Sequence, residues 1–215
     1  RAIAFAQANP DQCVATVGIH PHEASNLTLE QITSQLEELD ALAKDEKVVA
    51  VGECGFDFYY NDKNELLERQ EALLRGQIAI ARKYGLPLSF HVREAFDDFW
   101  RVFESYSGIS GVLHSFTDRP VHLERAIKYG LSIGINGIAS FISHSWQRDM
   151  FKSIPLENIV IETDAPFLTP HPKRGTINTP ENVIYITNFL AELRGEEPST
   201  IAKVTTANAQ KLFNL

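Results

Sequence analysis

Four short apolar segments of this chain each end in a residue that can bind a metal ion. The segments read Val-Val-Ala-Val-Gly-Glu53, Pro-Leu-Ser-Phe-His91, Gly-Val-Leu-His114 and Ile-Val-Ile-Glu-Thr-Asp164. Short runs rich in β-branched residues are typical of strands buried on both faces, as in a parallel sheet. If such strands close into a β/α barrel, their carboxyl ends meet at one mouth. The pattern therefore predicts two carboxylates and two imidazoles around one point.

This mixture of oxygen and imidazole ligands suits Zn, Mn, Fe or Mg together with bound water. Each residue has a simpler interpretation when it is taken alone. His91 could be a hydrogen-bonded histidine, Glu53 a member of a buried ion pair, and Asp164 a turn residue. Burying two carboxylates without partners would cost several kcal/mol, and a cation removes that cost. Together, the four residues predict a metal-dependent hydrolase.

The composition of the 215-residue chain limits its class and its partners. With 44% hydrophobic and 22% charged residues, it is typical of a globular protein. A formal net charge of −8 argues against a surface coated with basic patches for duplex DNA. The two cysteines, Cys13 and Cys54, do not form a disulfide framework, and Cys54 is expected to be a core thiol. No signal peptide or spanning segment is recognisable, so we expect a cytoplasmic protein without a membrane partner.

Strand and helix patterns alternate along the whole chain. Strands are predicted at 13–19, 48–53, 87–92, 111–116, 131–139 and 159–164. The helix that begins at Thr28 has a capping box with Gln31 and an apolar stripe, and the helix of about 64–84 ends at Gly85. A short helix is predicted to carry Phe96, Phe99, Trp100 and Phe103. Further helices are predicted near Pro120, from Pro180 to about Arg194 and after Pro198, and residues 1–8 resemble the tail of another helix.

Six strands, each followed by a helix, predict an α/β fold with a parallel sheet. We interpret them as about six units of a TIM-type (β/α)8 barrel, strands three to eight, with the first one or two units absent. On this view residues 1–215 form a single, N-terminally incomplete barrel domain. The alternative is an open doubly wound sheet, but no Gly-rich phosphate loop follows an early strand.

Five motifs follow one another along the chain. They are Thr16-Val-Gly-Ile-His20-Pro-His22, Gly52-Glu53-Cys-Gly-Phe-Asp57, His91-Val-Arg93-Glu-Ala95, His114-Ser-Phe and Glu162-Thr-Asp164-Ala-Pro166-Phe-Leu. The tail segments Arg174-Gly…Asn178-Thr-Pro180 and Thr205-Thr-Ala-Asn208 accompany them. In order and spacing these motifs resemble the TatD family of metal-dependent deoxyribonucleases.

The resemblance implies a barrel of the amidohydrolase kind that binds one or two divalent ions, Mg, Mn or Zn, and hydrolyses phosphodiester bonds of DNA. It implies that Glu53 is a shared ligand and that His91 and His114 are ligands. Asp164 would be both a ligand and the base that orients water, so Glu53 and Asp164 are the expected catalytic residues. Glu162, two residues before Asp164, would lie one layer deeper and support the ligands.

Three residues are expected to bind substrate. His20 resembles a family residue at the mouth, where it could contact phosphate or the attacking water. Arg93 could bind a phosphate through two hydrogen bonds, or form an ion pair with Glu94 or Asp97. Arg174 lies in the loop after the last strand, the usual phosphate corner of such barrels. A structural role is slightly preferred for His22.

The negative net charge favours a single-stranded or frayed DNA end over long duplex DNA as the substrate. The resemblance to the family implies a 3′–5′ exonuclease that serves DNA repair or degradation. No obligate protein partner is expected. The alternative is an amidohydrolase-type enzyme that acts on a small ester, lactone or amide with the same centre. Family members usually begin with a His-x-His strand, which is not present here. That strand could lie upstream in a longer polypeptide, or the chain could be a truncated, non-catalytic barrel or a member that lacks these ligands.

Overall fold

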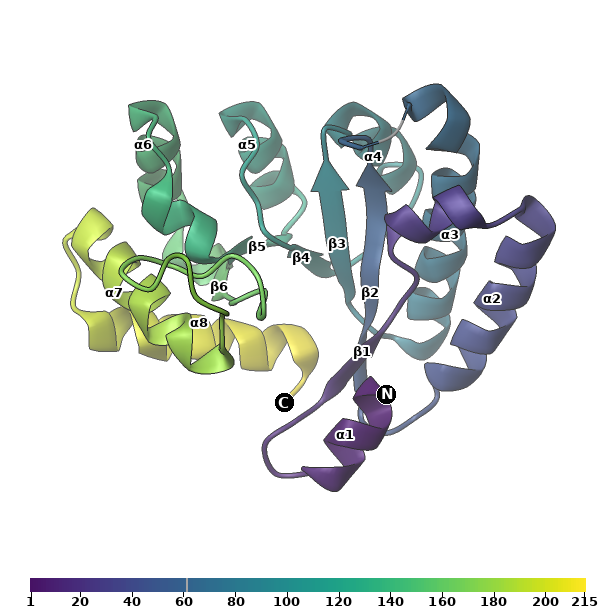
Figure 1. The fold of residues 1–215 in the computed structure, drawn as a ribbon, viewed down its shortest axis with the longest axis horizontal. Coiled ribbons are helices and arrows are strands. Elements are labelled where there is room, and N and C mark those ends of the chain that lie inside the picture. The colour runs from purple at the N-terminus through teal and green to yellow at the C-terminus, as the bar shows by residue number, and fades with distance from the viewer. Residues whose placement is uncertain (61) are drawn as a thin grey trace. The chain divides into compact units, whose positions relative to one another are not determined.

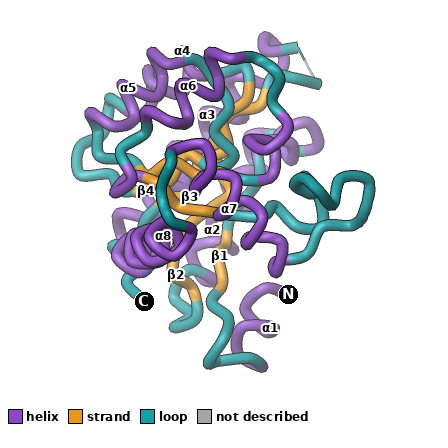
Figure 2. The backbone as a smooth tube through the Cα atoms, turned by 90° about the vertical axis from the view of Figure 1, so that its left-hand side faces the viewer, coloured by secondary structure: helices purple, strands orange, loops and turns teal. Residues whose placement is uncertain are grey.

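The computed structural model describes residues 1–60 and 62–215. It divides into two compact units, Arg1–Gly111 and Val112–Leu215, which are described separately. In the described residues, six strands alternate with helices along the chain. Figure 2 colours the strands orange and the helices purple. This alternation confirms the predicted α/β class.

Unit 1 is built on three parallel strands that are neighbours in chain order. Helix α3 packs against β2, and α2 packs against α3 on its far side (Figure 1). The elements of this unit are α1 (Ala2–Ala8), β1 (Ala15–Val17), the 3-10 helix η1 (Pro21–Asn26), α2 (Leu29–Leu42), β2 (Val48–Asp57), α3 (Lys63–Tyr84), β3 (Leu88–Arg93) and α4 (Phe96–Phe103).

Unit 2 also has parallel strands in chain order, since β5 pairs with both β4 and β6. Helix α8 packs against β6 and against α7. The elements are β4 (Gly111–Leu113), whose first residue closes unit 1, α5 (Pro120–Lys128), β5 (Ser132–Ile135), η2 (Gly137–Phe141), α6 (Ser145–Ser153), η3 (Leu156–Asn158), β6 (Ile159–Ile161), η4 (Pro180–Asn182), α7 (Val183–Arg194) and α8 (Pro198–Phe213).

Helix ends follow the predicted capping chemistry. The Thr28 hydroxyl accepts from the Gln31 N–H at 3.2 Å, and the Gln31 side chain accepts from the Thr28 N–H at 2.8 Å, so the capping box is confirmed. Gly85 ends α3 in the left-handed conformation, at a φ of 67°. The stripe of α2 is only partly buried: its central residues are covered, whereas Leu29 and Leu42 at its two ends are exposed. The reason is that the helix packs through its middle turns.

Strand lengths differ from the predictions in both directions. Strand β2 continues to Asp57, so the prediction that Glu53 ends its strand is wrong. The two glycines at Gly52 and Gly55 suggest a strand end, but pairing with β3 continues past them. In unit 2, β4, β5 and β6 are shorter than predicted, because the apolar runs continue into turns.

Aromatic side chains form much of the core of unit 1. Phe90 of β3 lies edge to face with Phe99 of α4, with ring centroids 5.1 Å apart, and Trp100 is fully buried beside them. This packing fixes β3, which carries His91, against α4. No helix in residues 1–60 and 62–215 combines the length and apolar character needed to cross a membrane.

Candidate metal centre

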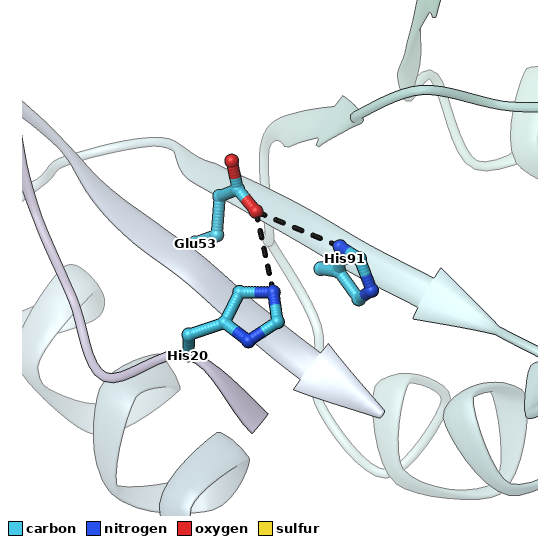
Figure 3. Close-up of side chains that lie close together, drawn as sticks. All are labelled: His20, Glu53 and His91. Atoms are coloured by element: carbon cyan, nitrogen blue, oxygen red, sulfur yellow. Dashed lines mark ion pairs between the residues drawn. The ribbon is translucent and has the colours of Figure 1, made fainter. Parts of the chain in front are cut away.

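Glu53 occupies a β-bulge in the middle of β2. Gly52 pairs with Ser89 and Cys54 with Phe90, so the register shifts at Glu53, which is the extra residue of the bulge. Bulges of this kind redirect a side chain and are frequent beside active sites. The Glu53 Oε2 atom lies 3.5 Å from His20 Nε2 and 3.5 Å from His91 Nδ1. Figure 3 marks these two contacts with dashed lines.

Asp57 anchors the imidazole of His91. Its carboxylate is only 1% exposed, and its Oδ2 atom lies 2.9 Å from His91 Nε2 and 2.8 Å from His22 Nε2. Burial raises the pKa of Asp57, but hydrogen bonds from His91, the Tyr59 N–H and His22 outweigh it and hold this pKa well below its usual range. Since an ionised carboxylate only accepts hydrogen bonds, His91 carries its proton on Nε2, and Nδ1 faces Glu53.

The pKa of His91 shows the same competition. Burial lowers it, and hydrogen bonding to Asp57 and Glu53 raises it by more, so the net shift is upward. A group of two carboxylates around one imidazole therefore favours a positive charge on that imidazole. A divalent cation on Nδ1 would supply positive charge in place of the second proton.

His20 accepts a hydrogen bond with one ring nitrogen and can donate with the other. Its Nδ1 accepts from the His22 N–H at 3.2 Å. Burial and the positive charge of His91 lower the pKa of His20 to about 4, so this imidazole is neutral at pH 7. The proton then lies on Nε2, which points at Glu53. Although ligand atoms of His20, Glu53 and His91 all lie within 4.8 Å of one another, this tautomer favours donation to an oxygen over metal ligation.

Two buried glutamines of α3 hold the backbone beside these residues. Gln77 accepts from the Ile19 N–H at 2.8 Å and donates to the Ile19 carbonyl at 3.0 Å, immediately before His20. Gln70 makes the same pair of contacts with the backbone of Asp57, both at 3.0 Å. Side-chain amides thus replace strand pairing at the two positions where the backbone leaves the sheet.

His114 in unit 2 is anchored in a similar way. Its Nδ1 lies 2.7 Å from Glu162 Oε2, and the other oxygen of Glu162 accepts from the Ser115 N–H at 2.6 Å. The opposite nitrogen, Nε2, lies 3.4 Å from Asp164 Oδ1. Glu162 therefore faces Nδ1 of His114, and Asp164 faces the opposite nitrogen, Nε2.

Asp164 lies in a loop whose backbone is held by Asn178. The Asn178 amide donates to the carbonyls of Thr163 at 2.8 Å and Phe167 at 2.6 Å. Asp164 itself has a φ of 59°, in the left-handed region. Ser115, which follows His114, shares that region, and such conformations in non-glycine residues cluster at functional sites.

The spacing of the two imidazole–carboxylate pairs fits a divalent ion. Ligands bound at about 2.1 Å in a tetrahedral arrangement lie roughly 3.4 Å apart. The distances of 3.5 Å for Glu53 and His91 and 3.4 Å for Asp164 and His114 match this value. In both pairs the second nitrogen is already bound by another carboxylate, the usual support of a histidine that binds a metal.

Both arginines predicted to bind substrate place their guanidinium groups over aromatic rings. The Arg93 guanidinium carbon is 3.5 Å from the Tyr59 ring centroid, and that of Arg174 is 3.6 Å from the Phe141 centroid. Within residues 1–60 and 62–215, Arg93 forms no ion pair with Glu94 or Asp97. Stacking of this kind leaves the N–H edge of a guanidinium available to an anion.

Asp57 is the residue that the sequence analysis missed. The sequence pattern predicts a strand that ends at Glu53, which leaves Asp57 outside the site. In a continuous strand, Glu53 and Asp57 are an even number of residues apart, and that spacing was the available signal. Cys54 is fully buried, and burial raises the pKa of its thiol, which agrees with a core role.

Comparisons with known proteins agree with this geometry. The model of the TatD related DNase family matches residues 1–214. The 3′–5′ ssDNA/RNA exonuclease TatD of Rahnella sp. is 37% identical over 218 residues, covering 98% of this chain and 81% of that protein. YabD of Bacillus subtilis, named an uncharacterized metal-dependent hydrolase, is 34% identical, covering 95% of this chain and 79% of that protein.

A solved structure extends the comparison to the fold. The crystal structure of a TatD homologue from Escherichia coli K12 is 31% identical, with a TM-score of 0.84, and covers 99% of this chain and 81% of that chain. This agreement supports the predicted barrel type of fold. By the family match, the sequence identities and this structural likeness, the chain belongs to the TatD related DNase family.

Proposed function

We propose that this protein is a divalent-metal-dependent hydrolase that removes nucleotides from the 3′ ends of single-stranded or frayed DNA. One observation carries the proposal: each of two imidazoles is fixed by a carboxylate on one nitrogen and faces a second carboxylate with the other. Family membership supports the choice of phosphodiesters over small esters, lactones or amides.

Glu53, His91, His114 and Asp164 are the proposed ligands of one or two divalent ions, Mg²⁺, Mn²⁺ or Zn²⁺. When bound, such an ion lowers the pKa of water and offsets the negative charge that develops on phosphate. In the neutral imidazoles of His91 and His114, Asp57 and Glu162 hold the proton on the nitrogen that faces them, which leaves the opposite nitrogen to the ion.

The remaining residues act on the water and the phosphate. Asp164 accepts the proton of the attacking water and orients the lone pair of the water oxygen. His20 donates from Nε2 to a phosphate oxygen or to that water. Arg93 and Arg174 bind phosphate through the guanidinium edges that stacking leaves available.

The formal charge of −8 supports a strand end as substrate, because a long duplex would meet many unfavourable contacts. We further propose that residues 1–215 belong to one barrel domain. The two free cysteines support a reducing compartment such as the cytoplasm. A role in DNA repair or degradation is consistent with removal of nucleotides from strand ends.

The test compares substrates after the protein has been treated with a chelator. A 5′-labelled single-stranded oligonucleotide, the same sequence as a blunt duplex, and a set of small lactones, amides and phosphoesters are incubated with and without Mg²⁺, Mn²⁺ or Zn²⁺. We expect a ladder shortened from the 3′ end, only with metal, and fastest for the single strand. Metal-independent cleavage, no cleavage with any metal, or preference for a small ester would overturn the proposal.

A further inference from the structure

Two adjacent tyrosines follow β2 and leave most of their rings in solvent. Tyr59 is 49% exposed and Tyr60 is 67% exposed, among the most exposed large apolar side chains of unit 1. Within the described residues, neither phenol hydroxyl forms a hydrogen bond. Packing of the core therefore does not account for these two rings.

The pair is nevertheless held in a defined arrangement. The two rings meet edge to face, with centroids 4.6 Å apart and an interplanar angle of 90°. The Arg93 guanidinium carbon lies 3.5 Å from the centroid of Tyr59 and 5.3 Å from that of Tyr60. Since Arg93 covers Tyr59, the ring of Tyr60 is the larger aromatic surface left to a ligand.

The same two tyrosines are tied to the candidate metal ligands of unit 1. The Tyr59 N–H donates to Asp57 at 2.9 Å, and the carboxylate of Asp57 also fixes His91. The Tyr60 ring lies edge to face with the imidazole of His22, centroids 5.9 Å apart. The His22 ring also lies 6.1 Å from the His91 ring, centroid to centroid, so His22 links Tyr60 to the candidate ligand His91. A strand end with its phosphate at His91 would have a base within reach of Tyr60.

We propose that Tyr60, braced by Tyr59 and Arg93, is a stacking platform for a nucleobase at or near the cleaved end of the strand. This inference rests on the proposed function and adds the part of the substrate that is recognised besides the phosphate. Every base has a π face, so the platform accepts all four bases and contributes affinity without sequence selection. Arg93 takes part twice, by supporting the rings and by presenting its edge to the backbone phosphate.

The test measures binding of strands with and without a base to stack. Chelator-treated protein is titrated into 5′-fluorescein-labelled oligothymidylate, and into versions with an abasic residue at each of the last three positions in turn. Fluorescence anisotropy gives the Kd for the parent and for Tyr60→Ala, Tyr60→Phe and Tyr129→Ala. Tyr129 is an exposed tyrosine at the end of α5 and serves as the matched control. Circular dichroism checks that all variants fold.

We expect Tyr60→Ala to raise the Kd of the complete strand about tenfold, a typical effect of removing one stacked base contact. One of the abasic strands should bind the parent about as weakly, and it should not lose further affinity with Tyr60→Ala. Tyr60→Phe keeps the ring and should bind like the parent, as should Tyr129→Ala. With Mn²⁺ present, Tyr60→Ala should raise KM and leave kcat unchanged.

Two results would overturn the inference alone. One is a parent that cleaves DNA while Tyr60→Ala binds the complete strand with unchanged Kd. The other is an equal loss of affinity for complete strands and for strands abasic at each of the three positions. A parent that neither binds nor cleaves DNA would overturn the proposed function together with this inference.

Discussion

Each unit has one histidine that lies between two carboxylates, but the elements that carry these residues differ between the units. In unit 1, Glu53 and His91 lie within long strands, and the anchoring residue Asp57 belongs to the same strand as Glu53. In unit 2, His114 follows a three-residue strand, and its partners Glu162 and Asp164 belong to a loop. The same side-chain chemistry is thus obtained from a rigid sheet in one case and from a fixed loop in the other.

The difference lies in what replaces the missing strand hydrogen bonds. Unit 1 uses two glutamine side chains from α3 against the backbone of Ile19 and Asp57. Unit 2 uses Asn178, which belongs to the loop it holds. Both units therefore anchor the histidine with a carboxylate, although the elements that carry this carboxylate differ.

The largest effect should come from the carboxylates that face the histidines. Glu53→Gln and Asp164→Asn keep size and hydrogen bonding but remove the charge that a divalent ion requires. We expect each to lower turnover on single-stranded DNA by about 100-fold or more. The fold should survive, because each substitution keeps the size of the side chain and leaves the apolar faces of the strands intact.

The measurement is kcat on a labelled oligonucleotide together with a thermal melt of each variant. If Asp164→Asn is as active as the parent, the assignment in unit 2 is wrong. If both variants fail to fold, the residues form a structural ion-pair network and not a metal centre.

Substitution of the anchoring carboxylates should have a smaller effect, and the two substitutions allow a direct comparison of the two units. Asp57→Asn and Glu162→Gln leave the ligands in place but allow the wrong imidazole tautomer. Losses of about 10-fold to 100-fold in metal affinity are typical for such support residues. Asp57→Asn should have the larger effect, because Asp57 fixes two imidazoles and Glu162 fixes one. Equal Mn²⁺ affinities for both variants and the parent would show that anchoring is not needed.

The backbone supports should affect stability more than chemistry. Gln77→Leu leaves the N–H and carbonyl of Ile19 without partners, which is expected to cost about 1–3 kcal/mol of unfolding free energy. Asn178→Leu should cost a similar amount and should also lower kcat, because Asn178 holds the loop that contains Asp164. Urea unfolding and kcat measured side by side check this contrast. A larger loss of kcat for Gln77→Leu than for Asn178→Leu would reverse it.

The smallest effect is expected at a histidine outside both groups. His144 is exposed at the start of α6, and His144→Ala should match the parent in kcat and stability. His122 is not an equivalent control, although it also lies on a helix. It is 4% exposed and contacts Arg119 at 3.0 Å, so His122→Ala should retain kcat but unfold at lower urea. A drop in kcat for His144→Ala would extend the site beyond the residues named here.

Local sequence patterns predicted much of this architecture. The alternation of buried strands and amphipathic helices, the capping box at Thr28 and the helix end at Gly85 depend on neighbouring residues only. A supporting role for Glu162 was also expected, because residues two apart on an extended chain face the same side, but its contact with His114 was not.

The remaining features depend on partners distant in the sequence. The bulge at Glu53 exists only in the pairing of β2 with β3, so no local pattern marks it. The role of Asp57 depends on that longer strand. The contact of Arg93 with the Tyr59 ring was not among the two alternatives weighed for Arg93, phosphate binding or an ion pair with a neighbouring acid, because Tyr59 is distant from it in the sequence.

Direct titration of Mn²⁺ into chelator-treated protein tests the central claim that these carboxylates and histidines bind metal. Isothermal calorimetry on the parent, Glu53→Gln, Asp164→Asn and His144→Ala separates metal binding from catalysis. We predict saturable binding to the parent and to His144→Ala, and affinity at least about tenfold weaker in both carboxylate variants. Mn²⁺ affinity that is the same in all four proteins, or no binding to the parent, would contradict the account.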